Sequence, residues 1–104
     1  MPILTLENRH ISVDAEGFLT DYSDWDDDLA RTLAQQIGIT LTDRHWPILR
    51  FLRQDFADQG ETATLRRTSL RCDTPIRDLF ALFPGKPAKK MAYIAGLPKP
   101  RGCV

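Results

Sequence analysis

The chain has 104 residues, of which 42% are hydrophobic and 27% charged, and its formal net charge at pH 7 is zero. These values are ordinary for one globular domain with a single core, and two cysteines, one of them on the tail, argue against a disulfide scaffold. No apolar run approaches the length of a bilayer span, and the first residues lack the basic region and apolar core of a signal peptide. We therefore expect a cytoplasmic protein without membrane contact.

The first predicted element is a β-hairpin. Two short runs rich in β-forming residues, 3–6 and 10–13, are separated by residues 7–9. A turn over residues 14–17 follows, and Phe18 and Leu19 then return apolar side chains to the core.

The next predicted element is a helix that starts after Ser23. Ser23 or Asp24 is a suitable N-cap, and the aspartates at 26–28 would occupy the first turn, near the positive end of the helix dipole. Gly38 is a natural stop for this helix. Its apolar face consists of four residues at intervals of four: Trp25, Leu29, Leu33 and Ile37.

Two further helices are predicted before residue 73. One starts after Thr42, runs to about Asp58 and ends at residues 59–60. Its buried stripe consists of Trp46, Leu49, Leu52 (or Arg53) and Phe56. The other spans residues 62–72 and is dominated by arginines, with Leu65 and Leu70 as its large apolar residues.

The chain after residue 72 predicts two short helices. Asp73 and Thr74 can cap a helix that has Pro75 at its first position. This helix would bury Ile76, Leu79, Phe80, Leu82 and Phe83. Pro87 opens the last helix, and Gly96 ends it. The predicted fold is therefore mainly α, a small orthogonal helical bundle over residues 1–95 with an N-terminal β-hairpin.

The zero net charge hides an asymmetry between the two halves. Residues 1–61 hold five Lys/Arg and twelve Asp/Glu, whereas residues 62–104 hold nine Lys/Arg and two Asp/Glu. The basic half predicts contact with an acidic partner or with nucleic acid, unless the two halves neutralise each other. The candidate contact residues are Arg66, Arg67, Arg71, Lys89 and Lys90. The three arginines could belong to a helix-turn-helix-like unit, but no base-reading pattern accompanies them, so a solvated basic face is the commoner explanation.

Several kinds of active site are not supported by the sequence. His10 and His45 have neither the spacing nor the cysteine neighbours of a zinc site, and no nucleophile pattern accompanies them. No glycine-rich phosphate loop is present. We therefore predict no metal and no cofactor.

The C-terminal tail, residues 96–104, carries the strongest chemical signal, because its penultimate residue is Cys103. Pro98 and Pro100 favour an extended path, and Gly102 allows a hinge beside the thiol. A flexible arm anchored at Gly96 would carry the sulfur at most about 23 Å. Such an arm suits a thiol that enters another protein's active site; the alternative is a chain end with an incidental cysteine.

The surroundings of Cys103 predict modest reactivity in isolation. Thiolate is the reactive form, and the reference pKa of cysteine is about 8.5. The terminal carboxylate of Val104 opposes ionisation, whereas Lys99 and Arg101 favour it. This pattern is typical of a carrier that is activated in a partner's pocket rather than of a free-standing catalyst.

The tail resembles the C-terminus of the DsrC/TusE family of sulfur-relay proteins. The specific part is the run Ile94-Ala95-Gly96-Leu97-Pro98-Lys99-Pro100 followed by the penultimate cysteine. Weaker similarity covers nearly the whole chain, and residues 62–78 depart most. The resemblance implies a cytoplasmic carrier that accepts sulfane sulfur as a persulfide on Cys103, with Lys99 and Arg101 supporting the arm. A monomer is favoured, but the sequence leaves the oligomeric state open.

Within this family, the resemblance implies two pathways. A TusE-type protein receives sulfur from a TusBCD-like complex and passes it toward a tRNA thiouridylase, with indirect contact to the tRNA. A DsrC-type protein acts in dissimilatory sulfur metabolism and needs a second arm cysteine eleven positions before the last. That position is Ala92, and Cys72 lies outside the arm motif, so we assign Cys72 no role. The sequence thus favours a TusE-like carrier over a single-cysteine DsrC-like protein or a nucleic-acid-binding module.

Overall fold

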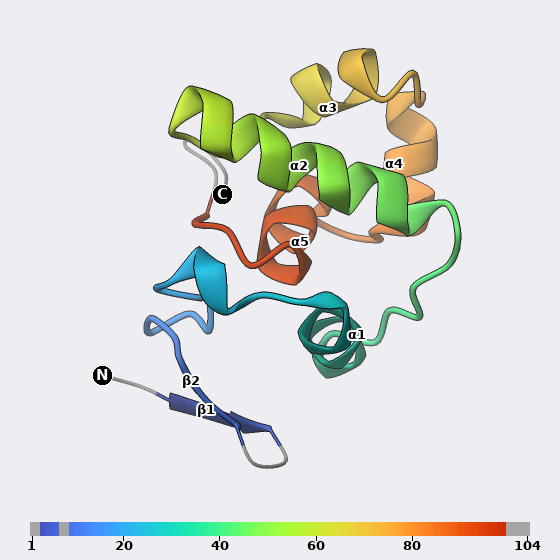
Figure 1. Ribbon diagram of the computed structural model, residues 1–104. Helices are drawn as coiled ribbons and strands as arrows, with labels where there is room; N and C mark the ends of the chain where they lie inside the picture. Colours follow the sequence, from blue (N-terminus) through green and yellow to red (C-terminus); the bar gives the residue numbers. More distant parts are fainter. Residues whose placement is uncertain (1–2, 7–8, 100–104) are drawn as a thin grey trace.

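The computed structural model describes residues 3–6 and 9–99, and over these residues the protein is a small helical domain with one hairpin (Figure 1). The predicted fold class is confirmed. In chain order the elements are β1 (Ile3–Leu6), β2 (Arg9–Ser12), the 3₁₀ helix η1 (Tyr22–Asp24), α1 (Asp27–Gln36), α2 (His45–Gln59), α3 (Leu65–Arg71), α4 (Ile76–Leu82) and α5 (Pro87–Ile94).

The N-terminal hairpin forms as predicted, with its second strand one residue earlier than expected. β1 and β2 pair antiparallel, Leu4 opposite Ile11, and an isolated bridge joins Val13 to Leu19. The side chain of Asp14 closes the turn that follows, since its Oδ1 accepts hydrogen bonds from the backbone N–H groups of residues 16 and 18.

The predicted start of α1 is wrong by three residues. Asp26 is the N-cap, and its carboxylate accepts a hydrogen bond of 2.8 Å from Leu29 N. Ser23 and Asp24 instead lie in η1, because Asp21 caps that short helix by accepting from Ser23 N. Trp25 consequently precedes α1 and lies in the link between the two helices.

The burial predicted for α4 is only partly right. Leu79 is fully buried and so is Phe83 just after the helix, but Ile76 and Phe80 are 41% and 46% exposed. Positions 79 and 83 share one face and positions 76 and 80 another, and a seven-residue helix packed on one side covers only the first. α3 is also shorter than predicted, since Thr64 caps it by accepting from Arg67 N.

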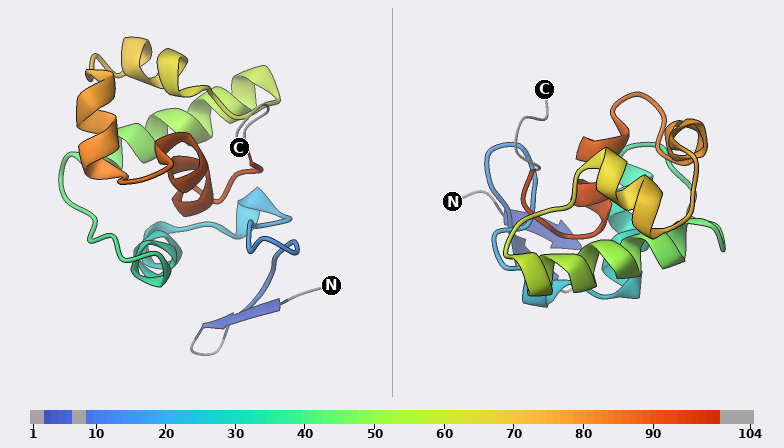
Figure 2. Two further views of the ribbon diagram at one scale, coloured as in Figure 1. Left: turned by 180° about the vertical axis from the view of Figure 1, so that it is seen from behind. Right: turned by 90° about the horizontal axis from the view of Figure 1, so that it is seen from above.

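The last helix, α5, is the centre of the fold. It packs against α1, α2 and α4, and Figures 1 and 2 show it between α2 and α1. Pro87 occupies its first position as predicted, and Met91, Ala92 and Ile94 are fully buried. The chain therefore enters its C-terminal tail directly from the core. Within the described residues, no helix is long and apolar enough to cross a membrane.

Candidate functional site

The predicted arm begins at a tightly built helix end. Gly96 N donates to Tyr93 O at 3.2 Å, and Leu97 N donates to Ala92 O at 3.0 Å. This pair of bonds is a Schellman motif, in which the residue after the helix adopts the left-handed conformation; Gly96 has φ +71°. A β-carbon at Gly96 would lie 2.6 Å from Trp25 Cδ1 and 2.7 Å from Leu19 Cδ1, so backbone conformation and space both require glycine.

The next residues of the tail are held against the domain. Leu97 is 0% exposed and belongs to the main core cluster. The hydroxyl of Thr62 donates to Pro98 O at 2.8 Å, and Lys99 Nζ lies 3.5 Å from a carboxylate oxygen of Glu16. The structure thus fixes the tail as far as Lys99. The remaining predicted site residues lie outside the described part of the chain: Pro100, Arg101, Gly102 and Cys103.

Side chains from distant segments hold the end of α5 from the other side. Trp25 Nε1 donates to Ile94 O at 2.8 Å, and Arg53 Nη1 donates to Ala95 O at 2.8 Å. The same guanidinium donates to Tyr22 O and lies 4.4 Å from the centre of the Trp25 ring. Its burial lowers the pKa of Arg53. This role of Arg53 was not predicted, although an arginine within the apolar stripe of α2 was the available signal.

The position expected to hold a second arm cysteine lies inside the core. Ala92 is fully buried in α5, and its carbonyl accepts the Leu97 N–H described above. Cys72 is the only cysteine among the described residues; it is half-buried at the C-terminal end of α3. Burial raises the pKa of the Cys72 thiol, which disfavours the nucleophilic thiolate.

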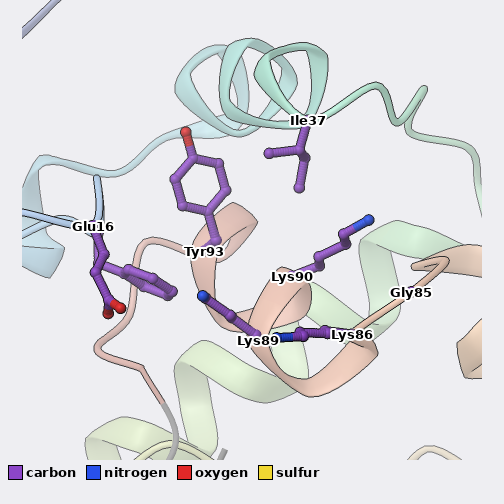
Figure 3. A pocket seen from close by; sticks show the side chains of 8 residues that line it. Glu16, Ile37, Gly85, Lys86, Lys89, Lys90 and Tyr93 are labelled. Atoms are coloured by element: carbon purple, nitrogen blue, oxygen red, sulfur yellow. The ribbon is translucent and has the colours of Figure 1, made fainter. Parts of the chain in front are cut away.

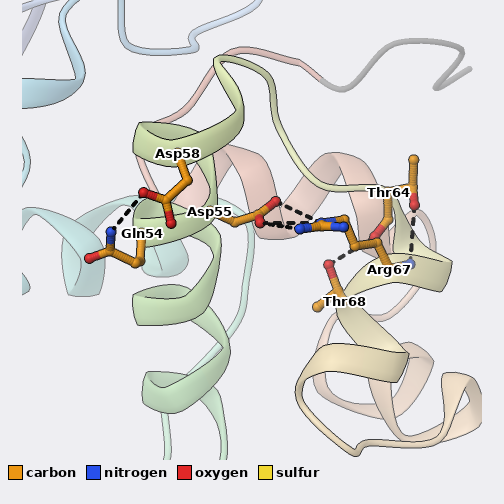
Figure 4. Close-up of polar contacts among 6 residues, drawn as sticks. All are labelled: Gln54, Asp55, Asp58, Thr64, Arg67 and Thr68. Carbon is orange, nitrogen blue, oxygen red and sulfur yellow. Dashed lines mark hydrogen bonds and ion pairs between the residues drawn. The ribbon is translucent and has the colours of Figure 1, made fainter.

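The three arginines predicted to form one contact surface differ in their surroundings. Arg67 forms a bidentate ion pair with Asp55, with Nη2 2.7 Å from Oδ1 and Nε 3.0 Å from Oδ2 (Figure 4). Asp55 is only 5% exposed, so this pair joins α3 to α2 and occupies the Arg67 guanidinium. Arg66 and Arg71 are exposed, and their role in binding stays a prediction.

Lys89 and Lys90 lie at a separate place, on a hollow of about 360 Å³ beside the start of α5 (Figure 3). We call it the lysine hollow. Its lining residues are Glu16, Phe18, Ile37, Gly85, Lys86, Lys89, Lys90 and Tyr93. The Lys90 ammonium donates to the carbonyl of Pro84. Phe18 and Tyr93 meet edge to face with ring centres 5.6 Å apart, and burial raises the pKa of the Tyr93 hydroxyl.

No group of three or more His, Cys, Asp or Glu side chains in the described ranges could hold a metal ion. His45 serves the fold. It is 4% exposed, its Nδ1 accepts from Thr42 N at 3.0 Å, and its Nε2 lies 2.8 Å from the carbonyl oxygen of Leu82. Cys103 stays the predicted reactive residue, and it lies outside the described part of the chain.

The chain is similar over nearly its full length to proteins named DsrC and TusE. The family model described as "DsrC like protein" matches residues 5–104. The sulfurtransferase TusE of Yersinia pestis is 38% identical, and the match covers 98% of this chain and 100% of the relative; TusE of Escherichia coli is 34% identical over the same shares. Crystalline oxidized DsrC, the γ-subunit of the dissimilatory sulfite reductase of Archaeoglobus fulgidus, is 37% identical with a TM-score of 0.86 and covers 99% of this chain and 100% of that one. DsrC of Allochromatium vinosum is 32% identical with a TM-score of 0.83, covering 98% and 97%.

Proposed function

Because the chain belongs to the DsrC-like family, confirming the resemblance seen in the sequence, we propose that it carries sulfane sulfur as a persulfide on Cys103. The acceptor pathway is the relay for 2-thiouridine formation in tRNA. The single observation that carries this function is the full-length similarity to sulfurtransferases named TusE in a chain that has the penultimate cysteine but alanine at position 92.

The transfer chemistry needs one thiol and no net oxidation. The Cys103 thiolate attacks the terminal sulfur of a donor persulfide, an S–S bond forms on Cys103, and the donor cysteine leaves as thiolate. An acceptor thiolate then attacks the terminal sulfur of the Cys103 persulfide, and Cys103 leaves as thiolate in turn. The chain is therefore a component of a sulfurtransferase system rather than a free-standing catalyst.

The structured base of the tail defines the working range of this thiol. Since the Thr62 hydroxyl holds the carbonyl of Pro98, the five residues from there to Cys103 reach at most about 18 Å. Donor and acceptor thiols must come within that distance of Pro98. The Lys99–Glu16 pair is exposed and weak, so Lys99 can leave Glu16 and, with Arg101, stabilise the persulfide anion. The path expected from the sequence, extended at Pro98 and Pro100 with a hinge at Gly102, stays a prediction.

The partners follow from the same assignment. A TusBCD-like complex would load Cys103, and a tRNA thiouridylase would unload it, with the tRNA bound to the acceptor. The protein would act as a monomer in the cytoplasm, where reducing conditions keep a carrier thiol free of disulfides.

A role in dissimilatory sulfur metabolism is the second candidate, because the similar solved structures include DsrC from sulfite reductases. A two-thiol cycle through the tail is not available to this chain, since Ala92 replaces the second cysteine and lies in the core. A nucleic-acid-binding module is less well supported, because one of its three arginines is paired with Asp55.

Complementation tests the pathway. In an Escherichia coli strain that lacks its own TusE, we expect the wild-type chain and Cys72→Ala to restore 2-thiouridine in tRNA, measured by liquid chromatography and mass spectrometry of nucleosides. Cys103→Ala should restore none while accumulating as folded protein. Restoration by Cys103→Ala would refute the carrier assignment. If the wild-type chain does not restore 2-thiouridine but Cys103 is loaded with sulfur in vitro, the result would favour a role in the dissimilatory pathway.

A further inference from the structure

The lysine hollow is a concave part of the surface beside the start of α5. Lys86, Lys89 and Lys90 come from the first turn of α5 and the residue before it, and they line one side of the hollow. Glu16 is the acidic residue among those lining it, and its carboxylate already has Lys99 as a partner. The hollow therefore presents an excess of positive charge at a concave surface, which attracts anionic groups.

The floor of the hollow is apolar. Phe18 is buried, and the half-buried Ile37 and Tyr93 complete the floor, so the lysines lie beside a place where an apolar side chain could be covered (Figure 3). A phosphate backbone would use the lysines but leave this floor empty. A peptide that combines carboxylates with an apolar side chain uses both, as protein interfaces commonly do with a buried apolar centre and a polar rim.

The hollow also lies beside the base of the tail. Glu16 lines the hollow and at the same time contacts Lys99, the last described residue before the segment that carries Cys103. A protein seated in the hollow would thus present its surface within the short reach of the thiol.

We propose that the lysine hollow docks an acidic peptide segment, with an apolar side chain in its centre, of a protein that exchanges sulfur with Cys103. This inference rests on the proposed carrier function for the identity of the partner. The hollow itself accounts for the chemistry of the docked segment, through its ammonium groups and its apolar floor.

A titration tests the docking chemistry without any sulfur transfer. The probe is a blocked peptide of sequence Glu-Glu-Phe-Glu-Glu-Phe, added to ¹⁵N-labelled full-length protein and followed by amide chemical shifts. We expect shifts at residues 16–18 and 85–93 and a dissociation constant that rises with salt. Lys86→Glu combined with Lys89→Glu should weaken binding at least about tenfold. Lys90 stays unchanged in this variant because it contacts the Pro84 carbonyl.

The matched control is Arg66→Glu combined with Arg71→Glu, which makes the same change in net charge on exposed residues of α3. Binding to this control should stay within about twofold of wild type. Equal weakening in both variants, or shifts that avoid the hollow, would overturn the proposal. Tighter binding of a single-stranded oligouridylate than of the peptide at the same residues would overturn the proposal and identify RNA as the ligand of the hollow.

The same variants separate this proposal from the carrier function. Lys86→Glu with Lys89→Glu should slow loading of Cys103 by a TusBCD-like donor at least about tenfold while leaving loading by inorganic polysulfide unchanged. If neither donor loads wild-type Cys103, the carrier function fails and the peptide titration still decides the docking chemistry. If the TusBCD-like donor and inorganic polysulfide each load the lysine variant and the arginine control at equal rates, the docking proposal alone fails.

Discussion

The base of the tail is buried and hydrogen-bonded, whereas the edge formed by α3 and α4 exposes apolar side chains. At the base, Gly96 and Leu97 are buried, and the carbonyls of three nearby residues accept hydrogen bonds from Trp25, Arg53 and Thr62. The α3–α4 edge instead exposes large apolar side chains, which are Leu70 at 71%, Ile76 and Phe80.

This difference shows which region of the fold is held by the most stabilising contacts. Contacts from the linker before α1, from α2 and from the loop after α2 converge on the point where the tail leaves the core. A carrier thiol on a short tail needs a fixed starting point, because its reach is set by the last anchored residue. The α3–α4 edge carries the part of the sequence that departs most from the family resemblance, and it is joined to α2 by the Arg67–Asp55 ion pair.

The largest expected effect comes from a β-carbon at the base of the tail. Gly96→Ala forces alanine into a left-handed conformation and into contact with Trp25 and Leu19, and should cost about 3–5 kcal/mol of unfolding free energy. Gly60→Ala is the matched control: Gly60 has φ +76° with no atom within 4 Å of the added carbon, so about 1 kcal/mol is expected. Urea denaturation measures both. Equal losses would show that the close approach to Trp25 has no energetic consequence.

The next effect compares one leucine from each region. Leu97→Ala removes a fully buried side chain and should destabilise the fold by about 3 kcal/mol, whereas Leu70→Ala on the exposed edge should change it by less than about 0.5 kcal/mol. Thermal and urea unfolding give the two values. If Leu97→Ala proved neutral, the tail would not be anchored in the core as described here.

The ion pair of the α3–α4 edge gives a smaller effect. Arg67→Ala leaves the buried Asp55 carboxylate without its partner and should cost about 1–3 kcal/mol. Arg66→Ala, one residue away and exposed, should cost less than about 0.5 kcal/mol. Urea denaturation gives the free energy of unfolding of both variants. Equal values would mean that the pair with Asp55 adds no stability and that Arg67 acts as part of the exposed basic surface.

The smallest perturbation concerns Cys72. Because burial raises the pKa of its thiol, less thiolate is present at a given pH below that pKa than in the unfolded chain. In a Cys103→Ala background, iodoacetamide should alkylate Cys72 at pH 8 more slowly in native protein than in urea. Equal rates would mean that Cys72 is accessible and ionised in the native state.

The sequence was most informative where the signal is local. Runs of β-forming residues predicted the hairpin, and apolar spacing together with Pro and Gly predicted the order of the helices. Pro87 marked the start of α5 correctly. The start of α1 was missed because Asp21, Asp24 and Asp26 are all suitable caps, and only the conformation of the chain selects among them.

Features that depend on distant parts of the chain could not be predicted in this way. Arg53 and Ala95 are 42 residues apart, and Thr62 and Pro98 are 36 apart, so their hydrogen bonds have no local signature. The exposure of Ile76 and Phe80 likewise depends on which face of α4 the other helices cover. Cys103 was identified from its position and from the family motif, and its role remains a prediction because it lies outside the described residues.

The most direct measurement of the central claim is the intact mass of the protein after incubation with a cysteine desulfurase, cysteine and a TusBCD-like donor complex. We expect a gain of one sulfur atom that is reversed by reductant, present in Cys72→Ala and absent in Cys103→Ala. The same gain in Cys103→Ala, or no gain in wild-type protein with the donor complex present, would contradict the assignment of Cys103 as the sulfur carrier.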